Sequence, residues 1–276
     1  MRIVRDVAAV RAAVAGAGRV GLVPTMGAFH EGHLSLIRAA RQACDLVVVW
    51  LFVNPTQFNE AADLAGYPRD EERDARLAAE CGADILFAPP VVEVYPDGFA
   101  TTVTVSGIAD VLEGAHRPGH FAGVATVVAK MFAMVAPEVA YFGAKDAQQV
   151  AVVRRMVTDL NLPVRIEVLP IVREPDGLAM SSRNVRLDPD QRRRATALHR
   201  GLAAGRAAVA AGERDAGAAA AVVARELAGA SITAEYIAVV DPDTFAPLER
   251  IEQRALIALA ARVGPVRLID NMEVAP

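Results

Sequence analysis

The chain has 276 residues, 53% of them hydrophobic and 22% charged, so it can bury a sizeable core, and we expect two domains. A net charge of -4 without a long basic run disfavours nucleic-acid binding, and the two cysteines are too few for a disulfide framework or a cysteine-rich metal cluster. No segment has the pattern of a signal peptide or a membrane span, which favours a cytoplasmic protein without membrane contact.

Strands and helices alternate along the first part of the chain, as in a doubly wound parallel sheet. Continuous apolar runs such as LVVVWLFV (46–53) are typical of central parallel strands. The strands expected here are 19–25, 46–53, 85–89, 139–143 and 164–172, and the helices are 5–15, 33–44, 70–82, 124–137 and 147–160.

The pattern changes after about residue 171. Two alanine-rich helices, 189–211 and 214–229, come before strand-like segments at 232–240, 254–263 and 266–274. This order predicts a smaller α+β domain. Among the histidines, His199 lies in a helical pattern and is expected to be an ordinary surface residue.

Two phosphate-binding signatures overlap near the N-terminus. Gly16, Gly18 and Gly21 form G-x-G-x-x-G, but a dinucleotide fingerprint must follow a strand and open a helix. Here the glycines follow a predicted helix and lead into a strand, so the order is reversed and the dinucleotide interpretation fails. The H-x-G-H of residues 30–33 has the right order, because it follows a strand and a turn and opens a helix.

The H-x-G-H segment has the chemistry of a nucleotidyl-transfer site. Gly32 lets a nucleotide approach the backbone, the helix N-terminus favours phosphate, and His30 and His33 add donors. Four further clusters accompany it: FVNPTQF (52–58), RPGHFAGVATVV (117–128), FGAKDAQQ (142–149) and REPDGLAMSSRN (173–184). Two of them follow predicted strands, where ligand sites of α/β proteins gather. Only two of the 29 basic residues are lysines, which makes Lys145 informative.

With PTMGAFHEGH, these segments stand in the order and spacing of one family, and the chain resembles the pantothenate synthetases (pantoate–β-alanine ligases, AMP-forming) from about residue 20 to 190. The resemblance implies a Rossmann-like domain of the HxGH nucleotidyltransferase type at 1–171, which binds ATP and pantoate, and a C-terminal lid domain at 172–276. It also implies a homodimer, dependence on ATP and Mg²⁺, and two steps. Pantoate and ATP would first give pantoyl adenylate and pyrophosphate, and β-alanine would then displace AMP to form pantothenate.

The resemblance also assigns roles to matching positions. The implied catalytic residues are His30, His33, Lys145, Ser181, Ser182 and Arg183. The same residues are implied to bind ATP, together with Pro24, Thr25, Met26, Gly143, Asp146, Val172 and Met180. Pantoate is implied to be held by Gln57 and Gln149, with Asn54 nearby, and Arg117 belongs to a matching segment without a defined role. The metal ligands are unknown, and Mg²⁺ is expected mainly through the ATP phosphates.

Three positions depart from the family pattern. Ala144 stands where the family usually has Glu, Ala147 where an aromatic residue is frequent, and Phe29 where Leu is common. Neither Ala144 nor Ala147 is a proposed catalytic group, so we expect altered packing or altered electrostatics at the helix start rather than lost activity, and Phe29 is a milder change.

The reaction needs no protein nucleophile, and the motifs offer none; positioning and electrostatic stabilisation would carry catalysis. Two alternatives remain open at this point. One is another nucleotidyltransferase with the same fold, and the other is a nucleotide-binding module without catalytic activity.

Overall fold

The computed structural model describes residues 1–59 and 61–276, which form two compact units. One unit comprises Met1–Ala144 and Val152–Pro170, and the other Lys145–Ala151 and Ile171–Pro276. The division into domains at residues 171 and 172, and the lid role of the second domain, stay predictions.

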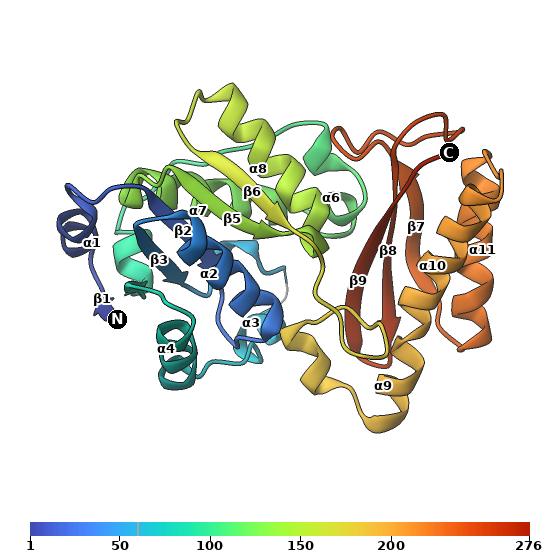
Figure 1. The fold of residues 1–276 in the computed structure, drawn as a ribbon, viewed down its shortest axis with the longest axis horizontal. Coiled ribbons are helices and arrows are strands. Elements are labelled where there is room, and N and C mark those ends of the chain that lie inside the picture. The colour runs from blue at the N-terminus through green and yellow to red at the C-terminus, as the bar shows by residue number, and fades with distance from the viewer. Residues whose placement is uncertain (60) are drawn as a thin grey trace. The chain divides into compact units, whose positions relative to one another are not determined.

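The first unit is built on a six-stranded, all-parallel sheet (Figure 1). Its strands in spatial order are β1 (Arg2–Val4), β4 (Ile85–Phe87), β3 (Leu46–Leu51), β2 (Val20–Thr25), β5 (Val139–Gly143) and β6 (Arg165–Leu169). The order runs outward from β2 in one direction and from β5 in the other, so the topological switch point lies between these two strands. This confirms the predicted Rossmann-like doubly wound sheet.

Helices flank this sheet. The long helices of the first unit are α1 (Val7–Val14), α2 (Glu31–Ala43), α4 (Glu71–Glu80), α7 (His120–Val135) and α8 (Ala147–Asp159). The last of these has its first residues, up to Ala151, assigned to the second unit. The shorter ones are α3 (Ala61–Ala65), α5 (Val91–Val94), α6 (Glu113–His116) and the 3₁₀ turns η1 (Pro55–Gln57) and η2 (Ile108–Asp110); the 3₁₀ turn η3 (Ala144–Asp146) begins in this unit and ends in the other. One core cluster joins α2 and α4 to the sheet through Ile37, Ala40 and Ala78, which pack with strand residues such as Val47 and Leu86.

Two differences from the expected elements have a local cause. Strand β1 was not predicted, because it has three residues, two of them exposed, and lies at the sheet edge. Helix α7 begins at His120 rather than near 124, since Gly119 takes a left-handed conformation (φ 80°) that starts the helix earlier.

The second unit contains a three-stranded antiparallel sheet of β7 (Ala234–Val240), β8 (Ala255–Val263) and β9 (Val266–Val274). The central strand β8 is buried at eight of its nine positions. The remaining elements of the second unit are η4 (Ser182–Arg186), α9 (Pro189–Ala195), α10 (Ala197–Ala210) and α11 (Ala216–Gly229). Figure 1 shows α10 and α11 side by side, and their contact is close because a Cβ at Gly205 would lie 2.9 Å from Val223.

The helix expected over 189–211 is instead two helices. Thr196 ends α9 because its amide and its hydroxyl both donate to the carbonyl of Arg193, three residues back. A hydroxyl that competes for a helix carbonyl in this way favours a break in the helix.

His199 on α10 is not the ordinary surface residue that was expected. Its Nδ1 atom is buried and has no hydrogen-bond partner within the described part of the chain. Its ring lies against the turn at Gly177, where an added Cβ would come within 2.2 Å of the imidazole. Burial lowers the pKa of His199, and the charges of Arg173 and Arg206 lower it further, while Asp270 acts in the opposite direction.

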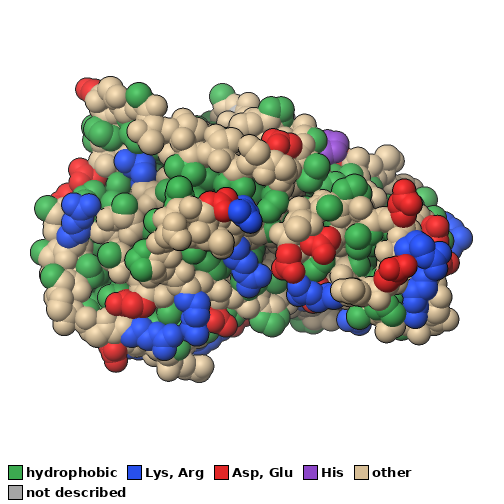
Figure 2. All heavy atoms as spheres, turned by 90° about the horizontal axis from the view of Figure 1, so that it is seen from above, with side chains coloured by type: hydrophobic (Ala, Val, Ile, Leu, Met, Phe, Trp, Pro, Cys, Tyr) green, Lys and Arg blue, Asp and Glu red, His purple; other side chains and the backbone are tan. Residues whose placement is uncertain are grey.

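The surface carries charges of both signs. On the face shown in Figure 2, Lys and Arg side chains are interspersed with Asp and Glu side chains. No helix within residues 1–59 and 61–276 is long and apolar enough to cross a membrane.

Candidate active site

The H-x-G-H segment stands at the start of α2, as predicted. His30 is the N-cap residue, and its Nδ1 atom accepts the backbone N–H of Gly32 at 3.1 Å. His33 Nδ1 lies 3.4 Å from the backbone nitrogen of His30, and the two imidazole centroids are 4.1 Å apart. A ring that accepts through Nδ1 carries its hydrogen on Nε2. Both imidazoles are therefore fixed in the tautomer whose Nε2 is a donor.

The residues before this segment close strand β2. Pro24 and Thr25 pair with β3, whereas β2 pairs with β5 at Gly21 and Leu22, nearer its start. A proline lacks the N–H of a regular ladder, so it fits where pairing on one side has ended. Thr25 is buried, and its hydroxyl donates to the carbonyl of Trp50 at 2.9 Å. The predicted ATP contacts Pro24, Thr25 and Met26 thus lie at the carboxyl end of β2, beside the switch point.

The predicted pantoate residues Asn54 and Gln57 form one buried amide cluster with Met26. Asn54 Nδ2 donates to Gln57 Oε1 at 3.0 Å and to the Gly123 carbonyl at 3.2 Å. Gln57 Nε2 in turn donates to the sulfur of Met26 at 3.1 Å. These bonds fix the orientation of the Gln57 amide. Its Nε2 atom is a donor, which suits a carboxylate or hydroxyl ligand.

Asn54 itself is engaged by protein groups. Its Oδ1 accepts the hydroxyls of Tyr95 (2.8 Å) and Thr56 (3.0 Å), and its side chain caps η1. Burial raises the pKa of Tyr95, against the lowering effect of its hydrogen bonds to Thr56 and Asn54. The geometry gives Asn54 a positioning role toward Gln57, and direct contact with pantoate stays a prediction.

The RPGHFAG segment braces Gln57 from the other side. His120, which is buried, donates from Nδ1 to the Gln57 carbonyl at 2.8 Å, and Arg117 donates to the same oxygen at 3.2 Å. Arg117 also lies 3.2 Å from His120 Nε2 and forms an ion pair with Glu113 at 3.9 Å. No role could be assigned to Arg117 from the sequence, and the structure shows that it holds the backbone of Gln57. The proximity of His120 and Gln57 was missed, because the two residues lie 63 positions apart in the sequence.

Predicted residues also follow β5. Gly143 ends that strand, and an added Cβ there would meet no described atom within 4 Å. In the second unit, Lys145 Nζ forms an ion pair with Asp146 at 3.7 Å, and the Lys145 carbonyl accepts the side-chain amide of Asn271 at 2.9 Å. Gln149 is half-buried on α8.

The MSSRN segment of the second unit is held in a defined loop. Met180 donates its backbone N–H to the carbonyl of Val172 at 3.0 Å, so these two predicted ATP contacts are adjacent. Ser181 caps η4 and accepts the backbone N–H of Arg183 at 3.3 Å, while Ser182 begins that turn. The loop is anchored by a bidentate ion pair between Arg173 and Asp270, with distances of 2.7 and 2.9 Å.

Each unit therefore gathers its own predicted residues. The first unit brings together the histidines and, separately, the cluster of Met26, Asn54 and Gln57. Joint action of these residues with those of the second unit stays a prediction. Within the described ranges, no group of three or more His, Cys, Asp or Glu side chains could hold a metal ion.

Comparison with known proteins decides the family. The pantoate–β-alanine ligase family model matches residues 2–273. The chain belongs to the pantoate–β-alanine ligase family. It is 54% identical to the pantothenate synthetase of Moorella thermoacetica, with 99% of this chain and 98% of that protein covered.

Solved structures of this ligase family have the same fold. The crystal structure of pantothenate synthetase from Thermus thermophilus superposes with a TM-score of 0.95 at 48% identity and covers both chains completely. The pantoate–β-alanine ligase from Francisella tularensis, crystallised with beta-gamma ATP and β-alanine, gives a TM-score of 0.83 at 33% identity, with 99% and 97% of the chains covered. The chain described here is therefore an enzyme of the ligase family.

Proposed function

We propose that the enzyme condenses pantoate with β-alanine in an ATP-dependent reaction, giving pantothenate, AMP and pyrophosphate through a pantoyl adenylate. Family membership supports the overall ligation, and the Francisella relative was crystallised with beta-gamma ATP and β-alanine. The observation that carries the adenylate route is the H-x-G-H segment, whose two imidazoles stand at a helix start with Nε2 as the donor atom.

In the first step, a pantoate carboxylate oxygen attacks the α-phosphorus of ATP, and the bond from that phosphorus to the bridging oxygen of pyrophosphate breaks. Gln57 and Gln149 hold pantoate, with Asn54 fixing the Gln57 amide. His30 and His33 donate to the phosphates, and the developing negative charge is stabilised by donors that need no reorientation. The remaining groups proposed to contact ATP are Pro24, Thr25, Met26, Gly143, Lys145, Asp146, Val172, Met180, Ser181, Ser182 and Arg183.

In this scheme Mg²⁺ binds together with ATP. Mg²⁺ is usually bound through one or two carboxylates and substrate phosphates rather than by a protein cage, and we propose that it binds here mainly through the ATP phosphates. When bound, it neutralises phosphate charge and stabilises the leaving pyrophosphate.

In the second step, the amine of β-alanine attacks the activated carbonyl, AMP leaves, and the amine loses a proton. The motifs contain no evident general base, so proximity to the acyl adenylate carries this step. Closure of a lid domain, residues 172–276, over the adenylate would exclude water from it. We further propose a cytoplasmic homodimer.

The products distinguish this route from a phosphate-forming ligase. The purified enzyme, supplied with ATP, Mg²⁺, pantoate and β-alanine, should release AMP, pyrophosphate and pantothenate in equal amounts. Formation of ADP and phosphate would refute the adenylate route. Turnover of a different carboxylate or phosphate substrate in preference to pantoate would favour another nucleotidyltransferase, and ATP binding without turnover would favour the non-catalytic module.

A further inference from the structure

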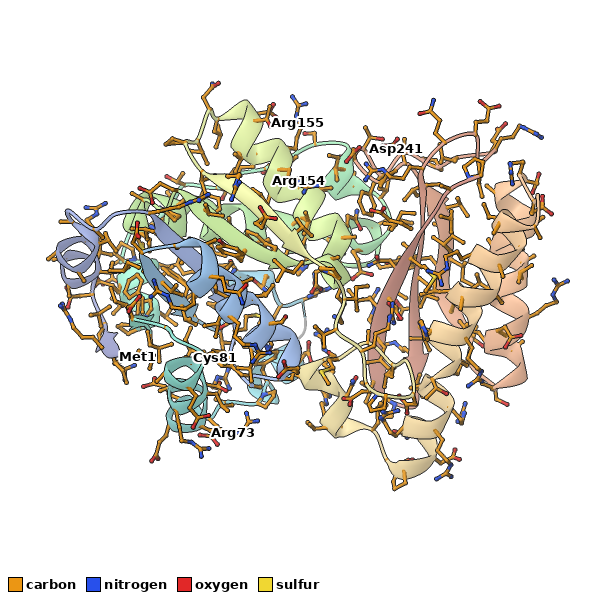
Figure 3. The ribbon with its side chains drawn as sticks, in the orientation of Figure 1. Met1, Arg73, Cys81, Arg154, Arg155 and Asp241 are labelled. Atoms are coloured by element: carbon orange, nitrogen blue, oxygen red, sulfur yellow. The ribbon has the colours of Figure 1, made fainter. Side chains whose placement is uncertain are left out.

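A buried carboxylate holds the turn that leads into the H-x-G-H segment. Asp74, on α4, is 1% exposed, and its two oxygens accept the backbone N–H groups of Ala28 at 2.7 Å and Phe29 at 2.8 Å. The neighbouring Arg73 donates to the Phe29 carbonyl at 3.1 Å. Figure 3 labels Arg73 on α4, at the other end of that helix from Cys81. Helix α4 therefore binds both the donors and the acceptor of the turn directly before His30.

The turn has a backbone that is unfavourable without such support. Gly27 has φ 90° and Ala28 has φ 53°, so two consecutive residues lie in the left-handed region. Alanine is disfavoured there because its Cβ crowds the following carbonyl. Gly27 also permits the close approach, since an added Cβ would lie 3.0 Å from the Asp74 carboxylate and 2.9 Å from Leu51.

The burial of the Asp74 carboxylate also indicates that its hydrogen bonds to the turn are needed. Burial raises the pKa of Asp74, and the nearby Asp70 raises it further, whereas the two backbone N–H groups and Arg73 lower it. A buried carboxylate is costly unless its hydrogen bonds are made. In Asp74 both carboxylate oxygens accept hydrogen bonds from the same turn.

We propose that Asp74 is a positioning residue, which holds the turn of residues 27–29 so that His30 and His33 meet the ATP phosphates in productive geometry. The inference rests on the proposed role of the two histidines. Asp74 touches neither substrate nor reacting atoms and acts through the backbone alone. Its oxygens must both accept, so an amide of the same shape would turn a donor toward one of the backbone N–H groups and lose that bond.

A double-mutant cycle tests the proposal. Asp74→Asn should lower kcat about 30-fold, because small misplacements of catalytic groups have effects of this order, and should change the KM for pantoate less than about threefold. In a His33→Ala background the same substitution should lower kcat less than about threefold, since the group it positions is gone. Equal losses in both backgrounds would overturn the proposal. Near wild-type activity of His33→Ala would instead overturn the proposed function, and this inference with it.

Two further variants separate positioning from general destabilisation. Asp84→Asn is the control at a more exposed carboxylate: Asp84 accepts the backbone N–H of Val47 at 2.8 Å and pairs with Arg41 at 2.7 Å, at the amino ends of the strands. A kcat loss as large as that of Asp74→Asn in this control would overturn the proposal. Adding Ala28→Gly to Asp74→Asn should recover kcat at least about threefold, because glycine adopts the left-handed turn without support. Absence of recovery would contradict it. If Asp74→Asn does not fold, Arg73→Ala takes its place in the cycle, with the same non-additivity expected.

Discussion

Replacing Gly123 by alanine should impair catalysis through Gln57. A Cβ at Gly123 would lie 2.5 Å from the Thr56 carbonyl oxygen and 2.9 Å from the Gln57 backbone nitrogen. Both are backbone atoms, so η1 would have to retreat by about 0.5–0.9 Å to restore tolerable contacts. A displacement of about 1 Å in a positioning group can cost about 10²-fold. We therefore expect Gly123→Ala to lower kcat/KM for pantoate about 30- to 100-fold.

Stability should change less than activity. Overpacking costs about 1–3 kcal/mol, and the gain from replacing a glycine within α7 offsets up to about 1 kcal/mol of it. Steady-state kinetics and thermal unfolding measure the two effects separately. Gly229→Ala, at the end of α11 where an added Cβ meets nothing within 4 Å, is the control for the helix effect alone. A kcat/KM for Gly123→Ala within about threefold of the wild-type value would refute the reasoning.

Three other predictions follow from single residues. Lys145→Ala should lower kcat/KM for ATP by about 10- to 100-fold in a folded protein, because a hydrogen bond to a charged group contributes about 1.5–3 kcal/mol; Lys130→Ala, which removes the other lysine, should lose far less, and equal losses would sink the assignment. His30 and His33 should act as phosphate donors rather than metal ligands, so removal of transition metals with a chelator, followed by Mg²⁺, should leave full activity; zinc-dependent activity would contradict this. Since the pKa of His199 lies below its ordinary value of 6.5, the unfolded chain takes up that proton first as the pH falls. The free energy of unfolding should therefore decrease below about pH 6.5, and His199→Gln should remove part of this decrease in urea titrations; an unchanged pH dependence would refute it.

The sequence predicted those parts of the site that are local along the chain. The H-x-G-H segment could be placed because the strand, the turn and the helix follow one another within residues 20–43. What could not be predicted are contacts between distant segments, such as that of Asp74 with the turn at Ala28, 46 positions away in the sequence. In the sequence, Asp74 is one of several acids in the first turn of a helix, and only the fold shows that it is buried.

The same limit applies to residues whose neighbours decide their environment. The helical pattern around His199 predicted an exposed residue, but the loop at Gly177 folds over its ring. Conversely, the apolar run of β3 predicted a central strand correctly, because burial on both faces leaves a direct trace in the sequence.

Isotope exchange tests the central claim most directly. If pantoyl adenylate is an intermediate, the enzyme should exchange labelled pyrophosphate into ATP when pantoate is present and β-alanine is absent. Gln57→Ala should abolish this exchange while ATP binding persists, since the Gln57 amide is proposed to hold pantoate and not the nucleotide. Exchange that strictly requires β-alanine would contradict the two-step account, and exchange that proceeds as readily with unrelated carboxylates would contradict the assignment of pantoate as substrate.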